Sequence, residues 1–449
     1  MKPPLASWDF TAAENRCRCR ILTTFMLLAS GAAFAQDALR YSLAGDAAAE
    51  AQRQQMASQP YTWKTGDFRL LLVPSVEMDY NDNVTISKTD PQSDFILKPL
   101  LQMSGSYPIT QQNFLSFSAG VGYDEYLRHS RYSAMRVNSD SQLLFDMRVK
   151  DFLFDFHDRF SFYEDPSAEA ALAGTATYGG LQNTAGLAAT WDLEQVVLTL
   201  GYDHQNFISS SEQFSYLNRA SELPLVRAGY QFDSRLTAGV EGGASFTSYD
   251  QEVLNDNSSY SAGVYADWKL GPYFEVQPRA GYTVYQFQHT SQPALVHSFS
   301  LSGAPIVALA GESIQTADLD AWYASLTLSH EVSKAVSYGL SAGHEIRLGI
   351  QSDVIEDWYF KPNISWNFIK DVTLNTSPFY EHGNQGGGNV SGNLTETYDW
   401  YGGEVTLSYP LMKKLMLSLN YRLTLRSSDI PDRDYAQNIV GIKLAYQPQ

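Results

Sequence analysis

From Phe68 to the end of the chain, apolar and polar residues alternate with a period of two. The first such segment has an apolar face made of Phe68, Leu70, Leu72, Val76, Met78 and Tyr80. Its other face is polar and consists of Arg69, Ser75, Glu77 and Asp79. Apolar positions on a helix would recur every three or four residues instead. The pattern therefore predicts β-strands with one apolar and one polar face.

Eighteen segments with this alternation follow one another along the chain. They are predicted at about 68–80, 94–104, 114–127, 135–149, 152–163, 181–193, 196–207, 219–232, 235–249, 258–270, 273–287, 319–332, 335–348, 357–369, 372–382, 395–409, 415–426 and 435–446. Runs of about ten alternating residues are the signature of a transmembrane β-barrel. The predicted fold class is therefore all-β, a transmembrane antiparallel β-barrel of about 18 strands within a range of about 16 to 20.

The connections between the segments support this fold. Joins after odd-numbered segments are long and polar, as at 81–93 and 164–180, whereas joins such as Lys150-Asp151 and Lys370-Asp371 are tight. Bacterial barrels have long extracellular loops and tight periplasmic turns. A soluble β-sandwich would also alternate. Here, however, the charges crowd one face, and Tyr and Trp gather near the segment ends, where the aromatic girdles of a membrane barrel would lie.

The N-terminus has the layout of an export signal. The arginines Arg16, Arg18 and Arg20 precede an apolar run from Ile21 to Ala29. Ala33-Phe34-Ala35 then supplies a small-residue cleavage site. We predict a signal peptide at 1–35, a periplasmic N-terminal arm at 36–66 and the barrel at 67–449. Both cysteines, Cys17 and Cys19, lie in the signal, so the mature chain is expected to have no thiol or disulfide chemistry.

Composition narrows the possible partners. The chain of 449 residues has a net charge of −18, and an acidic chain repels phosphate backbones, so no nucleic-acid partner is expected. Only 18% of its residues are charged and 13% are aromatic. Soluble domains have about 25% charged residues, so this balance is unusual for them.

A family resemblance is carried by the opening segment. Phe68-Arg69-Leu70, Pro74-Ser75-Val76 and Asp79-Tyr80-Asn81-Asp82-Asn83-Val84 resemble the first strand of a family of outer-membrane β-barrel porins. Similar barrels occur beside exopolysaccharide and exosortase gene sets. The resemblance implies an outer-membrane channel without a defined substrate or catalytic residues. For the Asn81–Asn83 corner, a turn in the first extracellular loop is one reading, and a divalent-cation or lipopolysaccharide contact is the other.

Residues on the polar phase are the candidate pore lining. At mid-depth we expect Lys98, Arg159, Glu241, Arg279, Lys361, Asn363 and Arg422. Because cations and carboxylates are interleaved, this lining is suited to small solutes, neutral sugars or weakly charged glycans. A dedicated path for an anionic polymer would be lined chiefly by Arg and Lys. The alternative is that these charges pair with one another and stiffen the wall.

The connection 288–318 is much longer than an ordinary loop and contains apolar residues. We expect it to fold inward and to narrow the channel through Leu295, Phe299 and Ile306. An additional strand pair, which would raise the strand number to about twenty, is one alternative. An outward hairpin is the other.

Enzyme chemistry is the competing class of function. Asp155 and His157 share one inward face two residues apart, as a carboxylate–imidazole pair for acid–base catalysis would. Side chains at this spacing are separated by about 7 Å along a strand, so we expect no direct hydrogen bond. The sequence contains no HExxH or phosphate-binding glycine motif, and its one GxSxG match, Gly339-Leu340-Ser341-Ala342-Gly343, falls inside the predicted strand 335–348. We therefore predict no enzyme activity, no catalytic residues, no metal site and no cofactor.

The predicted function is that of a porin-like channel in the outer membrane of a Gram-negative bacterium. It would pass small solutes or oligo- or polysaccharides, with a link to exopolysaccharide export as the finer hypothesis. The alternatives are a surface receptor or scaffold that transports nothing and, ranked last, a barrel hydrolase. Expected partners are outer-membrane lipid, lipopolysaccharide, the barrel-assembly machinery and a saccharide. The solute, the direction of transport, the oligomeric state and the true start codon are left open.

Overall fold

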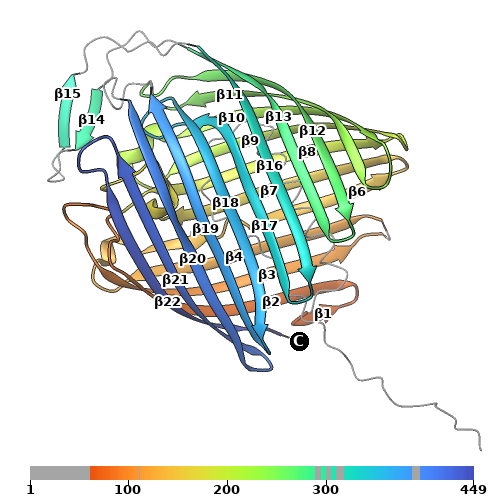
Figure 1. Ribbon diagram of the computed structural model, residues 1–449, viewed down its shortest axis with the longest axis horizontal. Coiled ribbons are helices and arrows are strands. Elements are labelled where there is room, and N and C mark those ends of the chain that lie inside the picture. The colour runs from red at the N-terminus through yellow and green to blue at the C-terminus, as the bar shows by residue number, and fades with distance from the viewer. Residues whose placement is uncertain are drawn as a thin grey trace, which may run out of the picture.

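One antiparallel sheet winds round into a closed barrel (Figure 1). The computed structural model describes residues 61–110, 112–288, 318–386 and 395–448, and the backbone of 295–299 and 305–309. The predicted signal peptide and most of the predicted arm lie outside the described residues.

The strands of the wall have 12 to 17 residues, apart from two with 4 and 8 residues. They are β2 (Phe68–Asn81), β3 (Asp94–Pro108), β4 (Phe114–Tyr126), β5 (Ala134–Val137), β6 (Gln142–Val149), β7 (Phe152–Glu164), β8 (Gly179–Asp192), β9 (Val196–Ser209), β10 (Arg219–Gln231), β11 (Leu236–Tyr249), β12 (Asn257–Gly271), β13 (Phe274–Phe287), β16 (Leu319–Ser333), β17 (Val336–Leu348), β18 (Val354–Ile369), β19 (Val372–Gly386), β20 (Glu396–Met412), β21 (Leu415–Ser428) and β22 (Tyr435–Tyr446). Short 3-10 helices η1 (Ser130–Tyr132), η2 (Pro166–Ala168) and η3 (Glu212–Leu217) lie in loops. In the described part of the chain, no helix has the length and hydrophobicity needed to cross a bilayer.

The barrel closes where its last strand pairs with its first. β22 runs antiparallel to β2, from Ser75 opposite Ala445 to Asn81 opposite Ile439. The sheet contains 20 strands, but β1 (Trp63–Thr65) pairs only with β2, and β5 and β6 share one position between β4 and β7. The ring therefore has 18 positions, which confirms the predicted number of strands.

The two strands inside the long connection stay outside the ring. β14 (Leu295–Phe299) and β15 (Pro305–Leu309) pair with each other in a separate two-stranded sheet. The alternative of a twenty-stranded barrel is therefore wrong.

The predicted fourth strand at 135–149 is interrupted. Residues 138–141 lie between β5 and β6, and Ser141 donates its backbone N–H to the carbonyl of Asn138 over 3.1 Å. The sequence here is Asn-Ser-Asp-Ser, and such side chains favour turns because they compete with the strand for backbone hydrogen bonds. The period of two continues across the interruption, which is why alternation alone did not reveal it.

The ends of the barrel differ as predicted. Three tight turns place a non-glycine residue in the left-handed region, with φ of 54° at Lys150, 68° at Glu194 and 66° at Asp371. In a fourth turn, the Asp233 carboxylate accepts the backbone N–H groups of Arg235 and Leu236. The long connections leave the opposite end. By the usual arrangement of bacterial barrels, this opposite end is the extracellular one.

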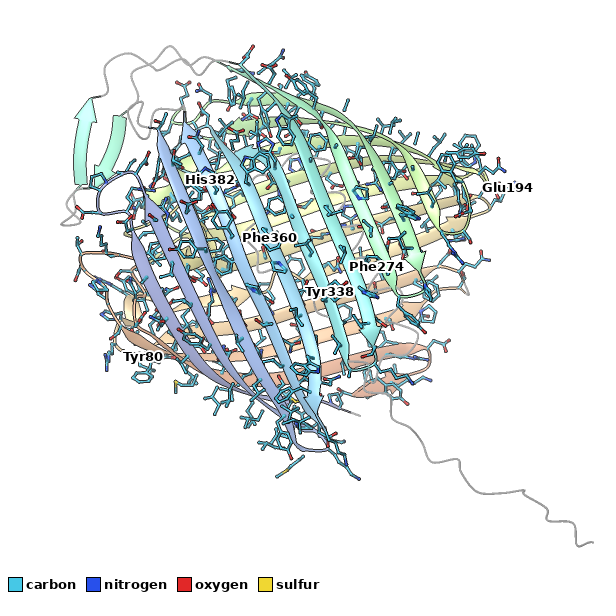
Figure 2. All side chains as sticks on the ribbon, viewed as in Figure 1. Tyr80, Glu194, Phe274, Tyr338, Phe360 and His382 are labelled. Carbon is cyan, nitrogen blue, oxygen red and sulfur yellow. The ribbon has the colours of Figure 1, made fainter. Side chains whose placement is uncertain are left out.

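The outer face of the wall is apolar and the inner face is polar. Val240 on β11 is 57% exposed and lies opposite Val264 on β12, which is also 57% exposed. Aromatic side chains such as Tyr80 and Phe360 also cover the outside (Figure 2). The next residues along the strands, such as Glu241, face inward and pair with other charges. A closed sheet with an apolar exterior is the structure of a transmembrane barrel.

The difference between the two faces predicts where in the barrel an added charge is tolerated. Val240→Arg places a cation against lipid and should lower the free energy of unfolding by about 2–4 kcal/mol. Thr327→Arg is the matched control, because Thr327 is exposed on the inner face opposite the uncharged Gln277 and Ser341. Reversible urea unfolding in lipid vesicles measures the free energy of unfolding of both variants. Equal losses in the two variants would contradict the assignment of inner and outer faces.

Candidate functional site

The lumen is open toward the tight-turn end and filled toward the long-loop end. Strand β19 shows the change within one element. Ser377 is exposed on its inner face, whereas Glu381 is 4% exposed and Gln385 is 3% exposed. Residues of the loops, rather than of the strands that form the wall, must therefore cover the upper part of the lumen.

The segment between β7 and β8, residues 165–178, provides much of this covering, and we call it the inward loop. Its carboxylate Asp165 accepts the backbone N–H of Ser167 over 2.9 Å and so caps the short helix η2, which begins with Pro166. Ala171 and Leu172 are fully buried, and Tyr178 is nearly so. A surface loop would expose these residues.

The inward loop joins other loops in one apolar cluster, which we call the mouth cluster. Four further loops contribute Ile86, Phe214, Leu217, Leu254 and Ile350, and the inner wall contributes Phe207, Tyr249, Ile355, Tyr398, Trp400 and Tyr435. Backbone hydrogen bonds connect the loops too, as from Gly174 N–H to the carbonyl of Ile86 over 2.9 Å. The extracellular mouth thus contains a small hydrophobic core inside a polar barrel.

Arginines hold the backbone of the inward loop in place. Arg422 on β21 donates to the carbonyl of Ser167 over 2.8 Å, and Arg426 on the same strand donates to that of Ala170 over 2.7 Å. Arg433, in the loop after β21, donates to the carbonyl of Ala171 over 2.7 Å. These bonds satisfy backbone acceptors that the loop would otherwise bury unpaired.

A single carboxylate forms ion pairs with two of these arginines. Glu396 at the start of β20 accepts from Arg426 over 2.7 Å and from Arg433 over 2.8 Å. Its side chain is nearly fully buried. Glu396 therefore holds the two guanidinium groups in position beside the inward loop.

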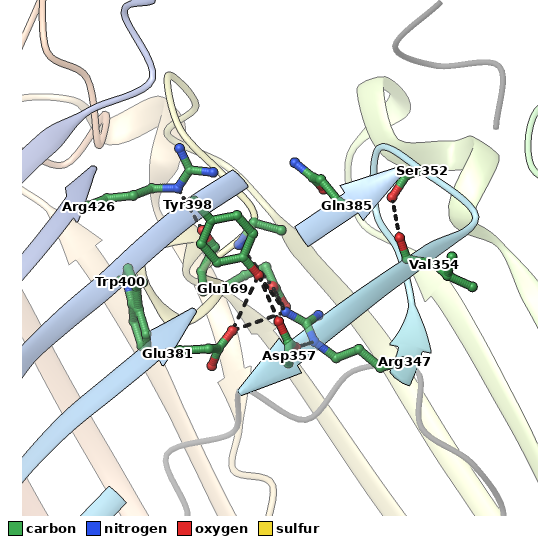
Figure 3. A network of polar contacts seen from close by, with 12 residues as sticks. Glu169, Arg347, Ser352, Val354, Asp357, Glu381, Gln385, Tyr398, Trp400 and Arg426 are labelled. Atoms are coloured by element: carbon green, nitrogen blue, oxygen red, sulfur yellow. Dashed lines mark hydrogen bonds and ion pairs between the residues drawn. The ribbon is translucent and has the colours of Figure 1, made fainter. Parts of the chain in front are cut away.

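A second charged network fixes Glu169 of the inward loop (Figure 3). Arg347 on β17 lies 3.1 Å from Glu169, 3.2 Å from Glu381 and in direct contact with Asp357. The hydroxyl of Tyr398 donates to Asp357 over 3.2 Å. Because all these groups are almost completely buried, removal of the Arg347 guanidinium would leave the Glu169 and Asp357 carboxylates without their ion-pair partner.

The two carboxylates of the inward loop respond to pH in opposite directions. Burial raises the pKa of Glu169, although Arg347 opposes this effect. Burial acts in the same sense on Asp165, but Arg422 and the hydrogen bonds from Ser167 outweigh it and lower the pKa of Asp165. Glu169 therefore favours the inward position most strongly when it is protonated, and Asp165 when it is ionised.

The structure places the seven predicted lining residues on the inner face and pairs most of them. Lys98 lies 2.8 Å from Asp79, Arg279 lies 2.7 Å from Glu241, and Lys361 lies 3.3 Å from Glu381. Asn363 faces Gly339 across the strand pair, and Arg159 stands opposite Thr184. Arg422 donates to the inward loop at Ser167. Lys361 shares the Glu381 carboxylate with Arg347, which pairs with Glu169 of that loop. Their role in a conducting pore stays a prediction.

The segment that fills the mouth, residues 165–178, is not the one in which a constriction was expected. The side chains of Leu295, Phe299 and Ile306 lie outside the described residues, so their predicted role stays a prediction. Sequence reasoning missed the inward loop. A signal was available, since Ala168 to Ala173 is almost entirely apolar within a connection expected to be polar.

The expectation about Asp155 and His157 was wrong. His157 Nδ1 lies 2.6 Å from Asp155 Oδ1, and its Nε2 lies 3.0 Å from Asp203 Oδ1 on β9. Both side chains lean toward each other along the strand, which shortens the separation that the backbone spacing implies. Among the described residues, no group of three or more His, Cys, Asp or Glu side chains could hold a metal ion.

Comparison with known proteins gives distant structural similarity only. No family model matches the chain, and no curated protein matches it. The Pseudomonas aeruginosa protein OpdL is 14% identical, with a TM-score of 0.41 over 84% of this chain and 98% of that one. P. aeruginosa OccK2 (OpdF) in complex with glucuronate and a BenF-like porin from Pseudomonas fluorescens Pf-5 are each 11% identical, with TM-scores of 0.46 over 85% and 98% of the chains. With TM-scores this low, the fold assignment rests on the closed strand pairing.

The pKa of Glu169 predicts how the inward loop responds to pH. A nitroxide on Ala173→Cys would report the loop's mobility in a chain whose native cysteines lie in the predicted signal peptide. The inward position is most stable at and below the ordinary carboxyl value of 4.5, and it loses this contribution as pH rises through the raised pKa of Glu169. Mobility in electron paramagnetic resonance spectra should therefore increase as pH rises above 4.5.

Glu169→Gln provides the control for this experiment. It should remove most of the pH dependence above 4.5, because the glutamine cannot ionise. The contribution of Asp165 falls in another window, since it is lost only as pH drops below the ordinary aspartate value of 3.8. If the labelled chain that retains Glu169 became less mobile as pH rises, the raised pKa assigned to Glu169 would be contradicted.

Proposed function

We propose that this chain is a channel for small hydrophilic solutes in the outer membrane of a Gram-negative bacterium, and that the inward loop narrows its extracellular mouth. The observation that carries the proposal is the inner wall, which is polar and exposed in the lower lumen and crossed above by the inward loop. A barrel made only to be rigid has no need of a hydrated interior.

The membrane location is supported by the shape of the barrel. The apolar outer face requires lipid, and long loops at one end with tight turns at the other are characteristic of outer-membrane barrels. An export signal at the N-terminus, expected from the sequence, is consistent with this location.

The filled mouth favours small solutes over polymers. Five loops meet in the mouth cluster, and a chain of linked sugars would have to displace several of them together. Several charges on the inner wall are also paired, as in Arg279 with Glu241, and the described part of the wall shows no continuous run of cations for an anionic polymer. Small neutral or weakly charged solutes suit this lining better than the exopolysaccharide of the finer hypothesis.

Single-channel recording in planar bilayers tests the proposal. Replacing Glu169-Ala170-Ala171-Leu172 by Gly-Ser-Gly-Ser keeps the loop length but removes its apolar anchors and its ion pair with Arg347. The conductance should rise by roughly two-fold or more, because the loop no longer fills the mouth. Unchanged conductance in an assembled barrel would show that the loop is not the constriction.

Two further variants make this experiment specific. The same Gly-Ser replacement of Lys88-Thr89-Asp90-Pro91, which are exposed at the same end, should leave conductance unchanged. Deleting residues 291–313 tests the constriction expected in the long connection. A larger conductance of this deletion variant would show that the connection also narrows the channel. A native chain that conducts nothing would favour a receptor or scaffold instead.

A further inference from the structure

Four inward residues on three adjacent strands form a compact polar group, which we call the polar row. Arg159 on β7 pairs with Thr184 on β8, and Thr184 pairs with Gln205 on β9. Side chains in such pairs have Cβ atoms about 4.5–5.5 Å apart, so these three lie next to one another. Asp203 stands on the same face of β9, two residues before Gln205.

Polar atoms of this group are buried without a hydrogen-bond partner in the described part of the chain. They are Arg159 Nε, Nη1 and Nη2, Thr184 Oγ1, Gln205 Nε2 and Asp203 Oδ2. Thr184 is 0% exposed. Buried polar groups in folded proteins are nearly always paired, so neighbouring unpaired atoms call for an explanation. Further down β8, the same residue type is satisfied, since Thr190 lies 3.2 Å from Thr199.

The geometry around Asp203 holds one of its oxygens and leaves the other available. His157 bridges Asp155 and Asp203 through its two ring nitrogens. This bridge passes over Gly186, where a Cβ would collide with the His157 ring and the Asp203 carboxylate. Asp203 Oδ1 is thus occupied, and Oδ2 remains as an acceptor beside the donors of Arg159 and Gln205.

The polar row lies directly below the mouth cluster. The next inward position on β9 beyond Gln205 is Phe207, which belongs to that cluster and pairs with Gln182 on β8. The inward loop itself connects the upper ends of β7 and β8. The polar row therefore lies at the narrowed part of the channel.

We propose that the polar row is a subsite for a neutral polyhydroxylated solute of hexose size, an inference that rests on the proposed channel function. A sugar hydroxyl can accept from Arg159, Gln205 or Thr184 while donating to Asp203 Oδ2. Neighbouring hydroxyls of one ring would meet donors and an acceptor together. A simple carboxylate is repelled by Asp203 and a simple ammonium by Arg159, so the mixed group favours hydroxyls over either ion.

Block of the ion current by glucose in planar bilayers, with the full-length protein, tests this subsite. Thr184→Val and Gln205→Leu each remove polar atoms at nearly constant volume. Each should raise the apparent Kd for glucose by about ten-fold or more, because hydrogen bonds to the solute are lost. Thr184→Ser, which keeps the hydroxyl, should bind as the native chain does. Thr190→Val is the matched control and should also leave the Kd unchanged.

The possible outcomes separate the subsite from the channel. Glucose that fails to block a conducting native chain overturns the subsite and leaves the channel standing. Block by acetate but not by glucose overturns the hydroxyl assignment in favour of an anion site. Equal effects of Thr184→Val and Thr190→Val show a general change in the wall and also overturn it. Absence of any conductance overturns the proposed function itself.

Discussion

The closed ring of backbone hydrogen bonds is the constraint on which this structure depends. Lipid offers no partner for an N–H or carbonyl group, so every strand needs two neighbours. The pairing of β22 with β2 removes the last free edges of the wall. Once the ring is closed, side chains can point only to lipid or to the lumen, and the period of two in the sequence follows from this choice.

The inward polar face creates a second requirement, because a charge buried in the wall is costly unless it is paired. Arg279 with Glu241 and Lys98 with Asp79 meet it within the wall. Near the mouth, arginines instead donate to carbonyl groups of the inward loop, as Arg426 does to Ala170. Buried ion pairs add little net stability, since desolvation offsets their attraction. They do fix the position of the loop, whose apolar residues then pack in the mouth cluster.

Most of the wall could be predicted from the sequence because the local alternation of apolar and polar residues identifies each strand. The alternation from Phe68 onward and the tight turns at Lys150 and Asp371 need no knowledge of distant residues. The course of the inward loop depends on partners far along the chain. Glu169 and Arg347 are 178 residues apart, and Ala170 and Arg426 are 256 apart. No local pattern encodes such pairings, although the apolar run from Ala168 to Ala173 marks the segment as unsuited to solvent.

The inward loop and the polar row share the same two strands, and this links the narrowing of the mouth to the chemistry below it. The chain enters the loop from the top of β7 and returns at Gly179, where φ is 147° and a Cβ would strike the carbonyl of Tyr163. Only glycine allows the return at this point without moving β7. The polar row below the loop is largely buried and some of its atoms are unpaired, which is costly. The loop that fills the mouth and the proposed solute subsite are therefore joined through β7 and β8.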